Sequence, residues 1–320
     1  MTPRVAILDD YQQVALKFGD WSTISNRVNI DVFTDTLKNE DAIVERLRPY
    51  EIICSMRERT KFPRSVLEKL PNLRLLTTTG MVNRGIDLDS AKERKIIVSG
   101  TAARGDSTVE HIWALVMAVA RYIVAEHNNV REGNPQWQTC VPFGLSGRTL
   151  GLIGLGRLGT AIAKIAKVFN MRVIAWSPNL TPERAEQGGA EFCSSKEQLL
   201  KTSDIVSLHM VLSEKTRNLI GAAELALMKP TAMLINTSRG PLVDEGALVE
   251  VLRNKKIGGA GLDVFDEEPL PLDHPLRKLD RVTLSPHNGY ANDTIYEQWW
   301  KQTVENVEKY LQGEPIRMLY

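Results

Sequence analysis

Three polar residues in the C-terminal half of the chain could do chemistry together. Arg239 stands in "INTSRGPLVDE", Glu268 in "GLDVFDEEPLP" and His287 in "VTLSPHNGY". Each follows an apolar run typical of a β-strand, and open parallel sheets bind ligands at the carboxyl ends of their strands. Taken singly, each has an ordinary explanation: a surface ion pair for Arg239, a solvated acid for Glu268 and a loop residue for His287.

As a set, the three side chains suit hydride transfer to a 2-oxo acid. The guanidinium fork of Arg239 can bind a carboxylate through two hydrogen bonds. His287 can give a proton to the carbonyl oxygen, because histidine titrates near neutral pH. A carboxylate such as Glu268 beside it would favour the protonated ring and orient it. A cofactor carries the hydride, so no protein nucleophile is needed.

The stretch "GLIGLGRLG" indicates where that cofactor binds. Gly154, Gly156 and Gly159 follow an apolar strand and open the predicted helix "RLGTAIAKIAKVF". The first glycine permits a tight turn, the second lets backbone approach a pyrophosphate, and the third lets the helix pack on the strand. A purely structural glycine turn is the alternative. The strand, the helix and the next strand nevertheless have the spacing of a dinucleotide-binding unit.

The next strand ends in "VIAWSPNL", where Ser177 occupies a position that usually carries an acid. In the NAD pattern that acid accepts hydrogen bonds from the adenosine ribose. It would also repel the extra phosphate of NADP, to which Asn179, Thr181 and Arg184 could donate. The expected cofactor is NAD(P), with NADP slightly favoured over NAD. Alternatively, NAD binds without the carboxylate and Arg184 lies on a solvated helix face.

Two series of alternating strands and helices would position these residues. The first runs from "VAILDD" to "KIIVSG" and the second from "TLGLIGLG" to "RVTLSP". Alternation with continuously apolar strands predicts parallel sheets covered on both faces. The sequence of residues 107–131 predicts one long helix, and a last helix is expected near residues 294–311. The predicted fold class is α/β, with two doubly wound parallel-sheet domains and a ligand cleft between them.

Composition excludes several other classes of protein. The formal charge is +1, which argues against a nucleic-acid binder that relies on a large positive excess. Cys54, Cys140 and Cys193 make neither a disulfide framework nor a zinc spacing, which favours a reducing cytoplasm and no metal site. The run "IWALVMAVARYIVA" is interrupted by Arg121 and is shorter than the roughly 20 residues of a membrane span. With no signal-peptide pattern at the start, we expect a cytoplasmic protein with no nucleic-acid or membrane partner.

The motifs together resemble one known family along essentially the whole chain. "GLIGLGRLG", "DIVSLHM", "LMKPTAMLINTSRGPLVDEGAL", "GAGLDVFDEEPLP" and "LSPHNGY" stand in the order found in D-isomer-specific 2-hydroxyacid dehydrogenases. That family includes phosphoglycerate, D-lactate and glyoxylate/hydroxypyruvate enzymes. The resemblance implies a flavodoxin-like substrate-binding domain from residues 1–100 plus 291–320 and a Rossmann NAD(P)-binding domain from residues 101–290. It also implies a homodimer formed through the helix after Ser107.

The same resemblance implies a role for each candidate residue. Arg239 would bind the substrate's carboxylate and carbonyl, and His287 would be the acid in reduction and the base in oxidation, supported by Glu268. Asp263 would hold the nicotinamide carboxamide. The expected substrate contacts are Arg57, Gly80, Met81, Val82 and Arg239. The expected cofactor contacts are Gly154, Gly156, Arg157, Leu158, Gly159, Ser177, Asn179, His209, Thr237, Ser238 and Asp263.

Some positions depart from the family pattern besides Ser177. "HMVLSEKT" lacks the proline that commonly follows the strand ending at His209, and Tyr290 in "HNGY" replaces a small residue. The loop "GMVNRGID" departs from the more usual glycine-rich form. Arg57 could bind a distal phosphate or carboxylate of the substrate, or pair with Glu58 or Glu51 at the surface.

The leading expectation is an NAD(P)-dependent reductase of glyoxylate/hydroxypyruvate type, which interconverts a small 2-oxo acid and its D-2-hydroxy acid. One alternative is a phosphoglycerate dehydrogenase-like enzyme. Another is a non-catalytic nucleotide-sensing protein on the same fold, which would have no evident need for Arg239, Glu268 and His287 together.

Replacing Ser177 with Asp should shift cofactor preference towards NADH, because a carboxylate repels the extra phosphate of NADPH. We expect the ratio of kcat/KM for NADPH to that for NADH to fall by roughly tenfold, which corresponds to about 1.4 kcal/mol. Ser177→Asn, which matches Asp in size without its charge, is the control. An unchanged ratio in Ser177→Asp would refute the role assigned to position 177.

Overall fold

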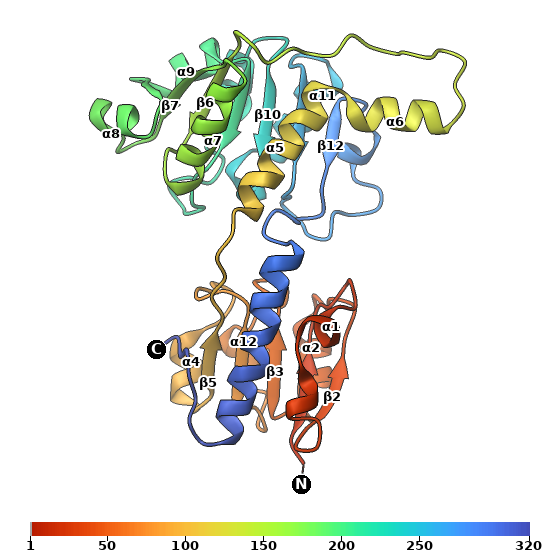
Figure 1. The fold of residues 1–320 in the computed structure, drawn as a ribbon, viewed down its shortest axis with the longest axis vertical. Coiled ribbons are helices and arrows are strands. Elements are labelled where there is room, and N and C mark those ends of the chain that lie inside the picture. The colour runs from red at the N-terminus through yellow and green to blue at the C-terminus, as the bar shows by residue number, and fades with distance from the viewer. Residues whose placement is uncertain (1) are drawn as a thin grey trace. The chain divides into compact units, whose positions relative to one another are not determined.

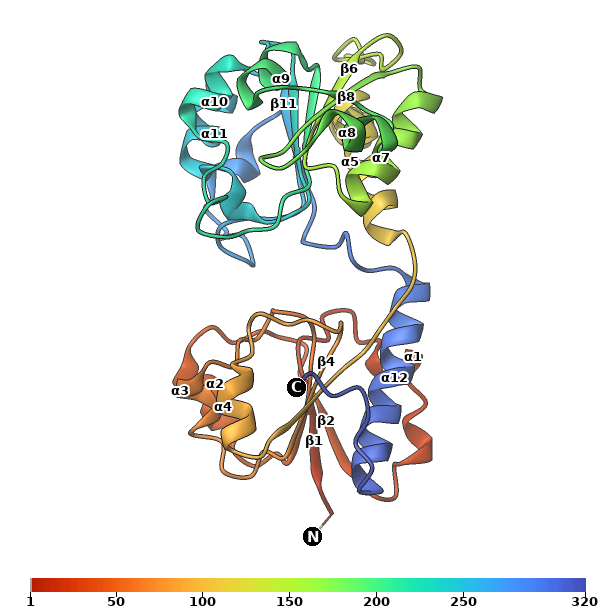
Figure 2. The ribbon, with the colours of Figure 1, turned by 90° about the vertical axis from the view of Figure 1, so that its left-hand side faces the viewer.

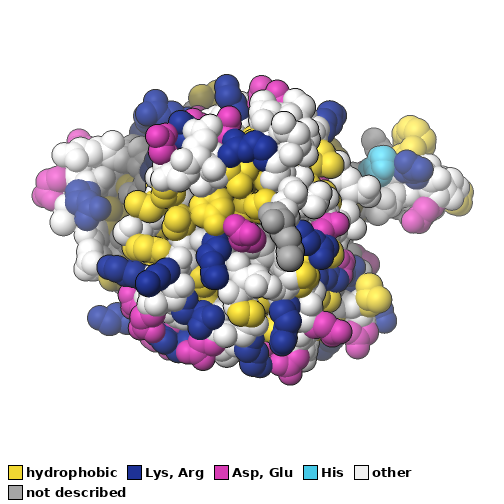
Figure 3. All heavy atoms as spheres, turned by 90° about the horizontal axis from the view of Figure 1, so that it is seen from below, with side chains coloured by type: hydrophobic (Ala, Val, Ile, Leu, Met, Phe, Trp, Pro, Cys, Tyr) yellow, Lys and Arg dark blue, Asp and Glu magenta, His cyan; other side chains and the backbone are white. Residues whose placement is uncertain are grey.

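The computed structural model describes residues 2–320, which form two compact units (Figure 1). The first unit comprises Met1–Gly105 and Asn292–Tyr320, and the second comprises Asp106–Ala291. The chain therefore leaves the first unit once and returns to it with its C-terminal helix. Figure 3 shows charges of both signs interspersed on the face that it displays, in keeping with the formal charge of +1.

The first unit is built on a five-stranded sheet of order β2-β1-β3-β4-β5, in which every pair of neighbours is parallel. Figure 2 shows α1 and α12 on one side of this sheet and α2, α3 and α4 on the other. The strands are β1 (Arg4–Ile7), β2 (Asn29–Val32), β3 (Ile52–Ser55), β4 (Leu75–Thr78) and β5 (Ile97–Gly100). The helices are α1 (Ala15–Phe18), η1 (Trp21–Thr23), α2 (Glu40–Leu47), α3 (Arg64–Leu67), α4 (Leu88–Glu93) and α12 (Asp293–Leu311).

The C-terminal helix α12 completes this unit, and the helix predicted near residues 294–311 is confirmed. Asn292 caps its first turn by accepting from the N–H of Ile295 at 2.8 Å. Trp300 is fully buried, and the amide of Asn306 donates to the carbonyl of Gly100 at 2.9 Å. The Asn306–Gly100 bond joins segments about two hundred residues apart in sequence.

The second unit contains a seven-stranded sheet of order β12-β11-β10-β9-β6-β7-β8, again with parallel neighbours. Its strands are β6 (Thr149–Ile153), β7 (Arg172–Trp176), β8 (Glu191–Phe192), β9 (Ile205–Leu208), β10 (Met233–Asn236), β11 (Gly259–Leu262) and β12 (Val282–Leu284). Its helices are α5 (Ser107–Ala120), α6 (Ile123–Arg131), α7 (Arg157–Val168), α8 (Pro182–Gln187), α9 (Lys196–Thr202), α10 (Ala222–Leu227), η2 (Gly240–Leu242), α11 (Glu245–Arg253) and η3 (Pro275–Lys278).

Both faces of this second sheet are buried, as its continuously apolar strands require. Along β10, Met233 and Ile235 join the cluster formed with α5 and α7, whereas Leu234 joins the cluster formed with α10 and α11. This alternation follows from the two-residue period of a strand. The prediction of two doubly wound parallel α/β domains is confirmed.

The prediction of one long helix over residues 107–131 is wrong. Two helices, α5 and α6, meet there at a bend of 62°. Tyr122 lies between them with a left-handed backbone, φ 53°, so the helical hydrogen-bond ladder is interrupted. The pattern of apolar residues continues across the bend, which is why the sequence did not reveal it. No single helix within residues 2–320 is long and apolar enough to cross a membrane, although the bent α5–α6 pair together meets that test of length and composition.

Candidate active site and cofactor site

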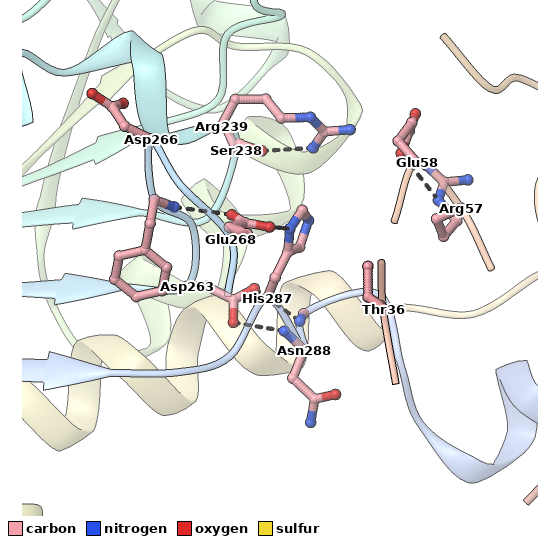
Figure 4. A network of polar contacts seen from close by, with 12 residues as sticks. Thr36, Arg57, Glu58, Ser238, Arg239, Asp263, Asp266, Glu268, His287 and Asn288 are labelled. Atoms are coloured by element: carbon pink, nitrogen blue, oxygen red, sulfur yellow. Dashed lines mark hydrogen bonds and ion pairs between the residues drawn. The ribbon is translucent and has the colours of Figure 1, made fainter. Parts of the chain in front are cut away.

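A histidine–carboxylate pair lies beyond the carboxyl ends of β11 and β12. Nδ1 of His287 is 2.6 Å from Oε2 of Glu268, and Oε1 of Glu268 accepts from the N–H of Phe265 at 2.9 Å (Figure 4). The carboxylate is thus fixed at one oxygen and holds the ring with the other. Because Nδ1 faces Glu268, Nε2 is the ring nitrogen left for a substrate. About a third of each side chain is exposed, 31% and 34%, so the pair is accessible.

The backbone at His287 has an unusual conformation for a residue with a side chain. Its φ is 52°, in the left-handed region, where a non-glycine residue costs of order 1–3 kcal/mol. The ring of Tyr290 meets the imidazole edge to face, with centroids 5.8 Å apart. Surrounding contacts must hold this conformation, and they include the hydrogen bonds that Asp263 accepts from the two residues after His287.

Asp263 is almost completely buried beneath the loop that carries His287. Its Oδ1 accepts from the N–H of Asn288 at 2.8 Å and its Oδ2 from the N–H of Gly289 at 2.9 Å. Nε2 of His111 lies 3.0 Å from Oδ1. Burial alone would raise the pKa of Asp263, but hydrogen bonds from His111, Ser285 and Asn288 hold that pKa below its usual range. The group is therefore an ionised anchor for the two peptides that follow His287.

Arg239 stands beyond the carboxyl end of β10, which is the neighbour of β11. Its Nη1 donates to the carbonyl of Ser238 at 2.6 Å, and its own carbonyl accepts from the amide of Asn236 at 2.9 Å. A Cβ added to Gly240 would lie 2.1 Å from the backbone of Phe265, so the Arg239 loop packs tightly against the segment that leads to Glu268. Three adjacent strands, β10, β11 and β12, thereby supply the three predicted catalytic residues to one edge of the sheet.

The glycine cradle lies between β6 and α7, where the strand order reverses and dinucleotides commonly bind. Gly154 has φ 100°, and a Cβ there would be 2.7 Å from the carbonyl oxygen of His209. A Cβ at Gly159 would be 2.5 Å from the carbonyl oxygen of Gly154, whereas one at Gly156 would meet no described atom within 4 Å. No side chain among the described residues caps α7, so its first N–H groups can bind an anion.

The residues beside this cradle differ in what they offer a cofactor. Arg157, at the start of α7, is largely exposed, and its Nη1 is 3.9 Å from Oδ1 of Asp106. Leu158 is partly buried. His209 follows β9, and both its ring nitrogens are buried without a hydrogen-bond partner in the described part of the chain. Burial lowers the pKa of His209 to about 4, so the ring is neutral at physiological pH. Beyond β10, Thr237 is half-buried and the hydroxyl of Ser238 donates to the carbonyl of Leu208 at 2.7 Å.

The segment after β7 forms a turn that leads into α8. The carbonyl of Ser177 accepts from the N–H of Leu180 at 3.1 Å, and Nη1 of Arg184 donates to the carbonyl of Asn179 at 3.0 Å. Thr181 caps α8. Glu183 lies in the first turn of α8, so a carboxylate stands near this turn. The backbone amide of Glu183 and the Thr181 hydroxyl lower the pKa of this carboxylate.

In the first unit, Arg57 and the loop after β4 are in contact. The backbone of Arg57 is left-handed, φ 50°, and its carbonyl accepts from the amide of Asn83 at 2.7 Å. Gly80 has φ 93°, and a Cβ there would be 2.1 Å from Nη1 of Arg57. Nε of Arg57 is 3.9 Å from Oε2 of Glu58, and a dashed line marks this ion pair in Figure 4. The next two residues of the loop, Met81 and Val82, are exposed.

Two residues of α5 that were not predicted from the sequence also hold the site. Ser107 donates to the carbonyl of Gly289 at 3.2 Å, and Nε2 of His111 lies 2.9 Å from the hydroxyl of Ser285. A weak signal exists in "STVEHIW", where Ser107 and His111, four positions apart, lie on the same helix face. Only the fold shows that this face meets the loop after β12.

A glycine cradle at the switch point of a parallel sheet, with a histidine–carboxylate pair at neighbouring strand ends, suits a nicotinamide-dependent dehydrogenase. Comparison with known proteins narrows this class to one family. Residues 113–289 match the D-isomer specific 2-hydroxyacid dehydrogenase, NAD binding domain. The chain belongs to the D-isomer-specific 2-hydroxyacid dehydrogenase family, as its motifs predict.

Individual relatives carry two different names. The chain is 39% identical to a glyoxylate reductase of Thermococcus litoralis over 85% of this chain and 84% of that protein. It is 36% identical to a D-3-phosphoglycerate dehydrogenase of Methanocaldococcus jannaschii over 89% of this chain and 54% of that protein. Among solved structures, a phosphoglycerate oxidoreductase from Vibrio cholerae has a TM-score of 0.90 and 32% identity, covering 97% of this chain and 99% of that one.

Two glycines of the cradle should respond differently to replacement by alanine. Gly159→Ala forces a methyl group against the Gly154 carbonyl, and we expect a loss of about 1–3 kcal/mol in unfolding free energy. Gly156→Ala meets no described atom, so stability should change by less than about 0.5 kcal/mol. Its methyl group would nevertheless occupy the space through which a pyrophosphate approaches, and cofactor Kd should rise at least roughly tenfold, a change of about 1.4 kcal/mol.

Urea unfolding and titration of reduced-cofactor fluorescence measure the two effects. Gly156→Ala with wild-type cofactor affinity would contradict the assignment of this loop as the pyrophosphate site. Equal stability of Gly159→Ala and wild type would contradict the packing role of Gly159.

Proposed function

We propose that this protein is an NAD(P)-dependent D-2-hydroxyacid dehydrogenase that acts as a reductase of glyoxylate/hydroxypyruvate type. It interconverts a small 2-oxo acid and its D-2-hydroxy acid. The observation that carries the proposal is the 2.6 Å contact between His287 and Glu268, next to the Arg239 loop. Family membership supports the reaction, and the similarity to a glyoxylate reductase supports the substrate class.

In the reductive direction each of the three side chains has one task. The Arg239 guanidinium binds the substrate carboxylate and orients the adjacent carbonyl. His287, protonated on both ring nitrogens, donates from Nε2 to the carbonyl oxygen as negative charge develops there. Glu268 holds Nδ1 and stabilises the positive ring before transfer. In oxidation the neutral ring takes the hydroxyl proton. The nicotinamide cofactor, when bound, supplies or accepts the hydride.

The chain's residues fit such a cofactor. The uncapped start of α7 and the open space over Gly156 suit a pyrophosphate, and Gly154, Arg157, Leu158 and Gly159 complete that loop. In this proposal the nicotinamide half would contact Thr237, Ser238, His209 and Asp263. At the adenosine end, Ser177 and Asn179 carry no negative charge that would repel the 2′-phosphate of NADP, and we therefore propose NADP as slightly favoured over NAD. Arg184, already at the Asn179 carbonyl, supplies the compensating charge.

The first unit is assigned to the substrate, with residues 1–100 plus 291–320 as its domain, and residues 101–290 as the NAD(P)-binding domain. Arg57, Gly80 and the amides of Met81 and Val82 bind the substrate in this assignment. The guanidinium of Arg57, held against Gly80, would also suit a second anionic group on the substrate. This geometry keeps a phosphoglycerate dehydrogenase-like activity as the second candidate.

A homodimer is part of the proposal. The segment 123–141 exposes several large apolar side chains, among them Trp137 at 72% and Val141 at 89%. Several exposed apolar side chains within one stretch of chain would suit a protein–protein contact, and a two-fold homodimer is the commonest arrangement. Cys54, Cys140 and Cys193 are free thiols, which suits the reducing cytoplasm in which we place the protein.

The test is loss of reduced-nicotinamide absorbance with NADPH and NADH in parallel, across 2-oxo acids from glyoxylate, hydroxypyruvate and pyruvate to phosphohydroxypyruvate and 2-oxoglutarate. We expect the small acids to turn over fastest. His287→Ala should lower kcat by roughly 10²- to 10⁴-fold, the usual contribution of a general acid. Arg239→Lys should also lower kcat/KM severely, because a point charge cannot replace the fork.

His274→Ala is the matched control, since His274 forms another histidine–glutamate pair, 3.1 Å from Glu245 in the same unit. It should retain wild-type turnover. An active His287→Ala variant would remove His287 from the mechanism, and fastest turnover of phosphohydroxypyruvate would favour the second candidate. Cofactor binding without turnover of any acid would instead indicate a nucleotide sensor.

A further inference from the structure

The loop that carries His287 is attached to helix α5 at two points on one face. Ser107 donates to the carbonyl of Gly289 at 3.2 Å. One turn later, Nε2 of His111 lies 3.0 Å from Oδ1 of Asp263 and 2.9 Å from the hydroxyl of Ser285. Residues four apart share a helix face, so α5 presents both groups to residues 285–289. We call Ser107 and His111 the α5 latch.

Asp263 connects this latch to the residue that does the chemistry. Its two oxygens accept from the consecutive N–H groups of Asn288 and Gly289, the residues directly after His287. The carboxylate is only 1% exposed, so water cannot replace a lost partner cheaply. A donor that fixes this carboxylate therefore also fixes the peptides that set the direction of the His287 ring.

The packing around Gly289 indicates that the arrangement is tight. A Cβ at this position would lie 2.9 Å from Oδ2 of Asp263 and 3.2 Å from the ring of His111. The backbone therefore lies directly on both side chains. Because His287 itself has a left-handed backbone, release of the following peptides would let it relax towards a more common conformation.

We propose that His111 is a positioning residue for the proton-transfer reaction: it donates from Nε2 to Asp263 and so holds the His287 loop in the geometry that keeps the ring against Glu268. The residue does not touch the substrate in this account. Its role rests on the proposed function, because it acts through His287. Ser107 and Ser285 contribute smaller parts of the same support.

Two variants separate positioning from packing. His111→Leu removes the donor, and His111→Gln keeps a side-chain N–H donor that can reach the carboxylate. We expect His111→Leu to lower kcat roughly 10- to 100-fold, with KM for the 2-oxo acid changed less than about threefold, because a small misplacement of a catalytic group has that cost. His111→Gln should restore kcat to within about threefold of wild type.

A second measurement reads the latch without turnover. Hydrogen–deuterium exchange, followed by mass spectrometry on a peptide spanning residues 284–291, reports whether the Asn288 and Gly289 N–H groups stay bonded. Exchange in that peptide should be at least about tenfold faster in His111→Leu than in wild type and close to wild type in His111→Gln. The peptide around Thr181, which caps α8 elsewhere in the unit, should exchange equally in all three proteins.

The outcomes distinguish the two proposals. If exchange is faster in His111→Leu but the wild-type protein turns over no 2-oxo acid, the proposed function is wrong and the role of the latch stands. Wild-type kcat and exchange in His111→Leu would overturn the latch and leave the function standing. Equal impairment of His111→Leu and His111→Gln would also overturn it, because the helix face would then need the imidazole for packing alone.

Discussion

The hydrogen bond between His287 and Glu268 is the interaction on which the proposed chemistry depends. A histidine side chain in a loop can rotate, and rotation would move the proton donor away from the carbonyl oxygen of the substrate. Glu268 removes that freedom, because one oxygen holds Nδ1 and the other is held by the backbone of Phe265. The pair is only partly exposed, so its mutual attraction is less screened than that of a surface pair.

The fold positions this pair through the order of the strands and through Asp263. Parallel order places the ends of β10, β11 and β12 next to one another, which brings the loops of Arg239, Glu268 and His287 to one edge. Asp263, the residue directly after β11, holds the His287 loop by accepting hydrogen bonds from Asn288 and Gly289. On the same unit, the close contacts of Gly154 and Gly159 shape the turn before α7. Rigid elements thus carry the groups that must be placed accurately.

Much of this arrangement could be predicted from the sequence, because apolar strand runs and glycine spacing are local signals. The two parallel sheets and the final helix follow from such patterns. The bend at Tyr122 does not, since its left-handed backbone leaves no mark in the apolar periodicity. The contact of His111 with Asp263 joins residues 152 positions apart and becomes visible only when α5 is packed on the sheet. The position of Glu183 beside the Ser177 turn could likewise not be predicted, because nothing in the sequence distinguishes it from other charged residues.

The most direct measurement of the central claim is kcat for reduction in Glu268→Gln, with the neighbouring Glu267→Gln as the control. Glutamine keeps the size of the side chain but not the charge that stabilises the protonated ring before proton transfer. We predict that kcat falls by roughly 10- to 100-fold in Glu268→Gln, while Glu267→Gln keeps the wild-type kcat. A wild-type kcat in Glu268→Gln would contradict the account, since His287 would then act without its carboxylate.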